Sequence, residues 1–257
     1  MNRIKSLVVF IVGITVSSTA LSASVKLTEP RLMEHVTPVP SALLINAYRY
    51  TGSLKSFSID AVTENDDVFL DKMVVTYTHH IQIRVKRPQK LYISTYGDLK
   101  DKEYYLNSGH FTVYDRMLNY YGKLDVPIKI DNALDYLFEL YDIKTSLANI
   151  LYTDLDKRIP PKNRGYYFGE SSVDDIACHH IGFFSDTQEY QVWIEKGKHP
   201  LIRKFIVIDR TNPFLPRSGT VLKWNIEEKN DDAIFIFKAP KTAQEIDITP
   251  VNEWEAE

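Results

Sequence analysis

The chain has 257 residues, of which 44% are hydrophobic, 12% aromatic and 25% charged. This apolar content argues against a disordered chain, and the formal net charge of -3 argues against a nucleic-acid-binding protein. The only cysteine, Cys178, excludes an internal disulfide, so packing has to stabilise the fold.

The first two dozen residues have the layout of a secretory signal. Arg3 and Lys5 form a short basic region, residues 7–16 are almost uninterrupted apolar, and small residues follow. This pattern predicts a signal peptide over residues 1–23 and therefore export. The apolar run is shorter than the roughly 20 residues that a membrane-spanning helix needs. A lipid anchor would need a cysteine at the cleavage site, so we expect neither kind of anchor.

The next segments predict a lead-in, a helix and a strand. Residues 24–40 are polar and rich in proline, which favours an extended conformation. Apolar residues at helical spacing predict a short helix over residues 41–51, ended by Gly52. A strand is expected over residues 56–63, and the acidic residues 64–67 are expected to form the turn after it.

The clearest element is the stretch 73–85, where apolar residues occupy alternate positions. One face of this strand carries Met73, Val75, Tyr77, His79 and Ile81, and the other carries His80 and Gln82. Such alternation is typical of an antiparallel sheet with one buried face. We expect the first set to face a concave interior and the second set to face solvent.

The remaining elements alternate between short strands and one helical insertion. A helix is expected over residues 131–141, where Leu134, Leu137 and Phe138 recur at helical spacing, with a shorter helical piece at 146–152. Turn residues separate the expected strands. These strands cover residues 91–95, 104–106, 111–114, 118–124, 165–170, 176–184, 190–195, 201–208, 220–226 and 234–237.

Together these elements predict one mainly β domain with some α structure, of the α+β class. Residues 41–240 should form a half-open antiparallel β-barrel of about 10–11 strands, with the short helices as a lid over its concave side. Residues 241–257 are expected to form a polar C-terminal tail.

Several motifs, in a fixed order, resemble a known family. They are YRYTGSLKSFSID, VKRPQKLYI, YYLNSGHFTVYD, VDDIACHHIGFF and YQVWIEKGKHPLIRKFIV. The chain is similar in these motifs to the predicted periplasmic proteins called domain of unknown function 2092, which resemble the LolA and LolB lipoprotein carriers in fold. The resemblance implies a LolA-like half-open barrel with a helical lid, an apolar interior and a periplasmic location. It implies no reaction.

The run Cys178-His179-His180 invites a chemical interpretation. Cys178 and His180 point to the same side of a strand, so they could meet His79 on a concave face and hold a divalent metal. The alternative is a small buried cysteine beside histidines that are satisfied by hydrogen bonds. The spacing matches no zinc pattern, and no catalytic motif is present. We therefore expect no metal, no cofactor, no catalytic residue and a non-enzymatic protein.

The aromatic content favours a hydrophobic ligand. Sixteen tyrosines and twelve phenylalanines exceed what a modest core needs and could line a partly closed barrel, although tyrosine doublets on strands can also place one ring on the surface. The predicted ligand-binding residues are Met73, Val75, Tyr77, His79, Ile81, Leu134, Leu137, Phe138, Cys178 and His180.

The sequence therefore favours a monomeric binder or carrier of a lipid or a lipid-modified protein. Transient contact with the membrane or with an envelope protein is expected, and contact with nucleic acid is not. A second hypothesis is an envelope sensor or protein-interaction module built on the same fold. A metal-binding protein or an enzyme is the third.

Overall fold

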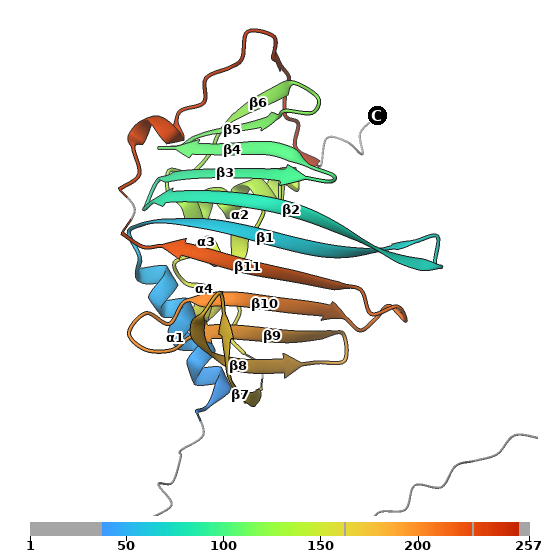
Figure 1. Ribbon diagram of the computed structural model, residues 1–257. Coiled ribbons are helices and arrows are strands. Elements are labelled where there is room, and N and C mark those ends of the chain that lie inside the picture. The colour runs from blue at the N-terminus through green and yellow to red at the C-terminus, as the bar shows by residue number, and fades with distance from the viewer. Residues whose placement is uncertain (1–37, 162, 228, 252–257) are drawn as a thin grey trace, which may run out of the picture. The chain divides into compact units, whose positions relative to one another are not determined.

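The computed structural model describes residues 38–251 apart from residues 162 and 228 (Figure 1). The predicted signal peptide and most of the predicted lead-in lie outside these residues. The helices are α1 (Pro40–Ser53), α2 (Ile130–Tyr141), α3 (Ala148–Leu151), α4 (Leu155–Arg158) and the 3-10 helix η1 (Asp232–Phe235). The strands are β1 (Ser56–Phe69), β2 (Met73–Lys86), β3 (Lys90–Gly97), β4 (Asp101–Asn107), β5 (His110–Asp115), β6 (Tyr120–Asp125), β7 (Tyr166–Val173), β8 (Ile176–Phe184), β9 (Gln188–Glu195), β10 (Ile202–Asp209), β11 (Arg217–Asn225) and β12 (Gln244–Glu245).

All twelve strands belong to one sheet, in the order β12-β6-β5-β4-β3-β2-β1-β11-β10-β9-β8-β7. Strands β1 to β6 form one antiparallel meander and β7 to β11 form another, and β1 pairs with β11 where the two meet. The order is linear, so the sheet is open and its two outer strands do not pair. The expected mainly β class and half-open sheet are confirmed. In the part of the chain that the structure describes, no helix is both long and apolar enough to span a membrane.

The hydrophobic core lies between one face of the sheet and the helices. Strand residues such as Ile59, Ile83 and Ile93 are fully buried because α1, α2 and α3 pack against this face. The helices contribute Leu44, Ala47, Ile130, Ala133, Leu134, Leu137, Ile150 and Leu151. Figure 1 shows α2 on the side of the sheet that faces away from the viewer. We call the helix-covered face the inner face and the opposite face the outer face.

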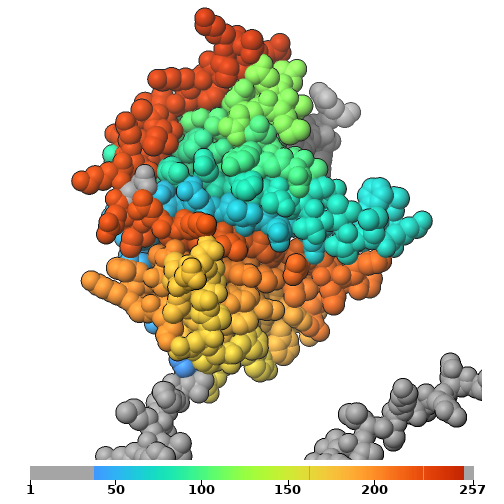
Figure 2. All heavy atoms as spheres, viewed as in Figure 1, coloured from blue at the N-terminus to red at the C-terminus, as the bar shows by residue number. Residues whose placement is uncertain are grey.

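The predicted pleat of β2 is confirmed in its second half. His79 is 5% exposed on the inner face, whereas His80 is exposed on the outer face. Met73 was expected inside, and this prediction is wrong, because its side chain is 55% exposed. The β1–β2 hairpin extends beyond the neighbouring strands and their helices (Figures 1 and 2), so alternation at its tip no longer separates a buried face from a solvated face.

The predicted turn at residues 64–67 is also wrong, because β1 continues to Phe69. The hairpin turns at residues 70–72 instead, with φ values of 51° at Leu70 and 50° at Asp71. Asp66 is held within the strand by both neighbours: its carboxylate accepts the Thr76 hydroxyl at 2.7 Å and the Arg217 N–H at 3.2 Å. Side-chain hydrogen bonds of this kind offset the low strand preference of aspartate.

The C-terminal part differs from expectation as well. The strand predicted at residues 234–237 is wrong, since η1 occupies residues 234 and 235 and no strand follows at 236–237. Asp231 favours the helical turn because its carboxylate caps it, accepting the N–H of Ala233 at 3.0 Å. The following chain does not remain apart from the sheet, because Gln244 and Glu245 form β12 and pair in parallel with β6.

We call residues 229–246 the C-terminal strap. Its start is fixed by Asn230, whose side-chain amide donates to the carbonyls of Phe57 at 3.1 Å and Val85 at 3.0 Å. Farther along, the ring of Phe237 contacts three tyrosines on β4, β5 and β6. In Figure 2 the strap, in red, runs beside these green strands. The strap therefore covers part of the outer face and one edge of the sheet.

Candidate functional site

A cavity of about 640 Å³ lies on the inner face of the sheet, between the strands and the helical segment that follows β6. The strands and the loop after β3 contribute Thr63, Asn65, His79, Ile81, Thr95, Lys100, Phe205, Ser218 and Thr220. The helical segment contributes Leu134, Phe138, Ile143, Lys144, Thr145, Ser146, Leu147, Ala148, Asn149, Ile150, Tyr152, Leu155, Arg158 and Ile159. Apolar side chains from both sides therefore enclose a space that also contains polar groups.

Two threonines in the middle of one row of the sheet leave room for the cavity. Phe205, Thr220, Thr63 and His79 lie directly opposite one another across β10, β11, β1 and β2, so they share the inner face. The hydroxyls of Thr63 and Thr220 bond to each other at 2.9 Å and are buried. Elsewhere on this face, large and fully buried side chains such as Ile83 and Ile93 fill the space between the sheet and the helices.

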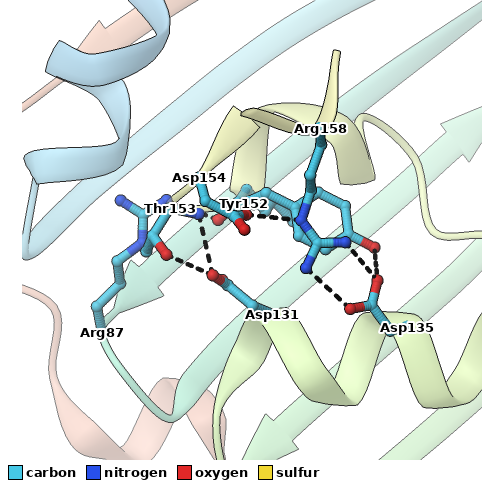
Figure 3. Close-up of polar contacts among 8 residues, drawn as sticks. Arg87, Asp131, Asp135, Tyr152, Thr153, Asp154 and Arg158 are labelled. Atoms are coloured by element: carbon cyan, nitrogen blue, oxygen red, sulfur yellow. Dashed lines mark hydrogen bonds and ion pairs between the residues drawn. The ribbon is translucent and has the colours of Figure 1, made fainter. Parts of the chain in front are cut away.

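The wall opposite the sheet is held by polar contacts between α2 and the segment after it (Figure 3). The carboxylate of Asp131 accepts the Thr153 N–H at 3.1 Å and also the Thr153 hydroxyl. Asp135 accepts the Tyr152 hydroxyl at 2.9 Å and two N–H groups of Arg158, at 2.8 and 2.9 Å. These contacts fix α3, α4 and the loop between them against α2.

The same contacts shift the pKa values of the groups that make them. Burial alone would raise the pKa of Asp135, but the hydrogen bonds from Arg158 and Tyr152 outweigh it and hold this pKa below its ordinary value. Burial and the bond to Asp135 raise the pKa of Tyr152. At neutral pH the network is therefore an ionised carboxylate held by a guanidinium and a neutral phenol.

Arg87 connects this wall to α1. Its guanidinium donates to the carbonyls of Thr51 at 2.8 Å, Gly52 at 3.2 Å and Leu54 at 2.9 Å, which satisfies the open end of α1. A further bond reaches the carbonyl of Leu151 in α3 at 2.6 Å. A single partly buried side chain directly after β2 thus connects two helices to the sheet.

The charged groups at the cavity are all basic. Among the described lining residues none is Asp or Glu, whereas Lys100, Lys144 and Arg158 are present. Lys144 forms an ion pair with Asp142 at 2.7 Å, and Arg158 is bound by Asp135. Within the described part of the chain, no ion pair involves Lys100.

Two buried polar atoms at the cavity have no hydrogen-bond partner in the described structure, Nε2 of His79 and Oγ1 of Thr145. Both residues are less than a tenth exposed. Burial, followed by the nearby charge of Lys100, lowers the pKa of His79, so its imidazole is neutral at pH 7.

Four of the predicted ligand-binding residues line this cavity: His79, Ile81, Leu134 and Phe138. Leu137 is buried beside it and borders only a void of about 10 Å³. The cavity lining does not include Met73, Val75 or Tyr77, which lie toward the projecting end of β2.

Cys178 and His180 were expected on the concave face, and this placement is wrong. Ile181 lies opposite Val192, and Val192 lies opposite Phe205. Ile181 and Val192 therefore extend the inner-face row that contains Phe205 and His79. His180 and Cys178 therefore point to the outer face. There the His180 ring stacks on Trp193 with centroids 4.0 Å apart, and the Cys178 thiol donates to the carbonyl of Ile176 at 3.3 Å.

The metal site that these residues could form with His79 is therefore not assembled. Among the described residues, no three His, Cys, Asp or Glu side chains are grouped as metal ligands would be. Burial raises the pKa of the Cys178 thiol, which makes it a poor nucleophile or ligand at neutral pH. The His180 ring forms a hydrogen bond of 3.3 Å with the side chain of Gln191, which agrees with the alternative that these histidines are satisfied by hydrogen bonds.

Apart from His79, the polar residues of the cavity were not among the predicted ligand-binding residues. Thr63 and Thr95 were recognisable in principle, because each directly follows apolar residues at the inward positions of its strand. Thr145 and Lys100 lie in irregular segments, and no periodic signal points to them.

A search of curated proteins finds no match to this chain. Among solved structures, the chain is similar to an uncharacterised conserved protein from Thermus thermophilus, with 9% identity and a TM-score of 0.46 over 80% of this chain and 99% of that one. It is similar to the lipoprotein LppX of Mycobacterium tuberculosis, with 12% identity and a TM-score of 0.45 over 75% of this chain and 97% of that one. For a LolA superfamily protein from Nitrosomonas europaea the identity is 11% and the TM-score 0.33, over 78% of this chain and 99% of that one.

The family comparison covers most of the chain. Residues 41–249 match the family described as predicted periplasmic protein, DUF2092. This range begins in α1 and ends beyond β12, so it contains the whole sheet, nearly all of the helical residues and the cavity. The chain therefore belongs to the DUF2092 family of predicted periplasmic proteins, as the order of its motifs indicated.

Proposed function

We propose that the protein is a non-enzymatic periplasmic binder or carrier of a hydrophobic ligand, either a lipid or the acyl chain of a lipid-modified protein. The observation that carries this proposal is the cavity on the inner face. Its volume of about 640 Å³ falls within the roughly 300–1,000 Å³ of typical ligand sites. Its helical wall is largely apolar, which suits a ligand whose transfer from water to an apolar site is favourable.

Phe138 supports the assignment of α2 as a lid. Its neighbours Leu134 and Leu137 are buried in the core, yet the Phe138 ring is 51% exposed at the cavity, with the Lys144 ammonium 5.2 Å from its centroid. An apolar chain in the cavity would bury this ring. The proposal thus explains why a large aromatic side chain lies at the border of an open cavity.

Binding can be tested with a fluorescent lipid-like probe and the Phe138→Asp variant. A carboxylate at the cavity should weaken probe binding, because it must lose water against an apolar surface. The matched control is Phe168→Asp on β7, since Phe168 is similarly exposed, at 57%, and does not line the cavity. Equal probe affinity for the parent and Phe138→Asp would reject the lid. Native mass spectrometry with lipid extraction of protein from the envelope would then identify any copurified ligand.

A second candidate function, a protein-interaction module, is favoured by the tip of the β1–β2 hairpin. Phe69 is 54% exposed and Leu70 68% exposed, beside the exposed Met73. Exposed apolar side chains that cluster on a projecting element are typical of contact surfaces. Leu70→Ser should leave probe binding intact and abolish crosslinking to an envelope partner if this candidate is correct. Unchanged crosslinking would reject it.

A further inference from the structure

The polar end of the cavity has features that an apolar ligand alone does not explain. His79 and Thr145 each bring a buried polar atom without a partner to a site lined by Lys100. An unpaired polar atom that is removed from water destabilises a protein, so such atoms tend to acquire partners when a ligand binds.

These groups belong to one region of the cavity. Ser146, next to Thr145, bonds to the Thr95 hydroxyl at 2.9 Å. Thr95 lies directly opposite Ile81, two residues from His79 on the same face of β2. Gly97 lies opposite His79, and the chain continues from there to Lys100, whose charge acts on the His79 imidazole.

The charge of this region is positive. Asp98 and Asp101 lie on either side of Lys100 in the sequence, but neither lines the cavity. The Asp98 carboxylate accepts the Thr78 N–H at 2.7 Å, and the Asp101 carboxylate is bound by Arg116. The other two basic side chains already have acidic partners, whereas Lys100 has none in the described structure. A hydroxyl, a neutral imidazole and an ammonium can all donate hydrogen bonds, and donors of this kind suit a negatively charged oxygen.

We infer that the region formed by His79, Thr145 and Lys100 binds the anionic head group of an amphiphile, a carboxylate or a phosphate ester, whose apolar chain fills the rest of the cavity. This inference rests on the proposed function. The Thr145 hydroxyl donates to a head-group oxygen, as does His79 when Nε2 carries the ring proton. Lys100 supplies the opposite charge at the border of the site.

The test compares ligands with the same chain and different heads. Palmitic acid, hexadecyl phosphate, methyl palmitate and hexadecyltrimethylammonium would compete with the fluorescent probe. We expect at least one of the two anionic ligands to bind roughly tenfold more tightly than the neutral ester, the scale of one charged hydrogen bond. The cationic ligand should bind no more tightly than the ester. Whether the acid or the phosphate binds better identifies the head group.

Two variants assign the preference to these residues. Thr145→Val and Lys100→Gln should each lose most of the preference for an anionic head while still binding methyl palmitate. The controls are Thr51→Val, a buried threonine of α1, and Lys241→Gln, an exposed lysine of the strap, neither of which lines the cavity. Lys100 is exposed, so its variant remains informative even if Thr145→Val fails to fold.

The outcomes separate this inference from the proposed function. Equal affinities for all heads in the parent protein would overturn the inference and leave the hydrophobic cavity standing. A preference that persists in both variants would overturn the assignment to these residues. If neither the probe nor any of the four ligands binds the parent protein, the proposed function itself is overturned.

Discussion

Arg158 of α4 holds Asp135 of α2 through two parallel hydrogen bonds, Nη1 to Oδ1 at 2.8 Å and Nη2 to Oδ2 at 2.9 Å (Figure 3). The planar guanidinium matches the two carboxylate oxygens, which fixes orientation as well as distance. The wall of the cavity is therefore joined to α2 by a directional ion pair in addition to apolar contacts.

Replacing this residue, Arg158→Gln, should loosen the segment after α2. Both side chains are about a third exposed, so we expect a loss of about 1 kcal/mol in the free energy of unfolding. Amide hydrogen exchange in residues 142–159 should become faster. The control Arg210→Gln removes an ion pair with Glu189, which does not line the cavity, and should leave exchange there unchanged. Unaltered exchange in Arg158→Gln would contradict the role of the pair.

A prediction about the hydrophobic core concerns Ile83, which is fully buried in β2. Ile83→Ala should lower the free energy of unfolding by about 2–5 kcal/mol, because it removes apolar contacts and leaves a cavity. Met73→Ala on the same strand should change it by only about 0.5 kcal/mol, since that side chain is mostly exposed. Urea denaturation measures both, and equal losses would show that the inner face is assigned wrongly.

Stability should fall as the pH decreases below about 6.5. Burial lowers the pKa values of His79, His179 and His180 in the folded protein. The unfolded chain then binds more protons than the folded one between the lowered pKa values and 6.5, so stability decreases with falling pH in this window. Urea midpoints measured from about pH 7.5 to about pH 5 should show this slope, and His79→Gln should reduce it. A constant midpoint in the parent would refute the prediction.

The C-terminal strap should depend on Asn230. Asn230→Ala removes the donor to the buried carbonyls of Phe57 and Val85, and we expect a loss of about 1–3 kcal/mol in the free energy of unfolding. Limited proteolysis should then cut the strap earlier than in the parent. Lys238→Ala, at a strap position, serves as the control. Identical cleavage rates in Asn230→Ala and Lys238→Ala would argue against this anchor.

The sequence predicted the strands well because their period of two survives folding. It placed His79 inside because the residues two positions before and after it are large and apolar, and it placed His80 outside because the corresponding residues are polar. The same period failed for Cys178 and His180. Alternation says which side chains share a face, but only pairing with neighbouring strands decides which face the helices cover.

The cavity was only partly predictable for a related reason. Leu134 and Phe138 follow from the apolar spacing of α2, which any packed helix shows. At the cavity, Thr145 and Lys100 come from irregular segments, and Arg158 comes from the four-residue helix α4. Their positions depend on tertiary hydrogen bonds, such as that between Ser146 and Thr95, which leave no local pattern.

The pairing of β1 with β11 has a consequence for how the chain folds. Every other antiparallel pair in the sheet joins strands that are consecutive along the chain, so each can form as a local hairpin. Ser58 and Asn225, in contrast, meet across most of the described sequence, and closing so long a loop is slow. During synthesis, β1 therefore exposes an unpaired edge until residue 225 has been made, and a chain that ends before β11 would offer that edge to other chains.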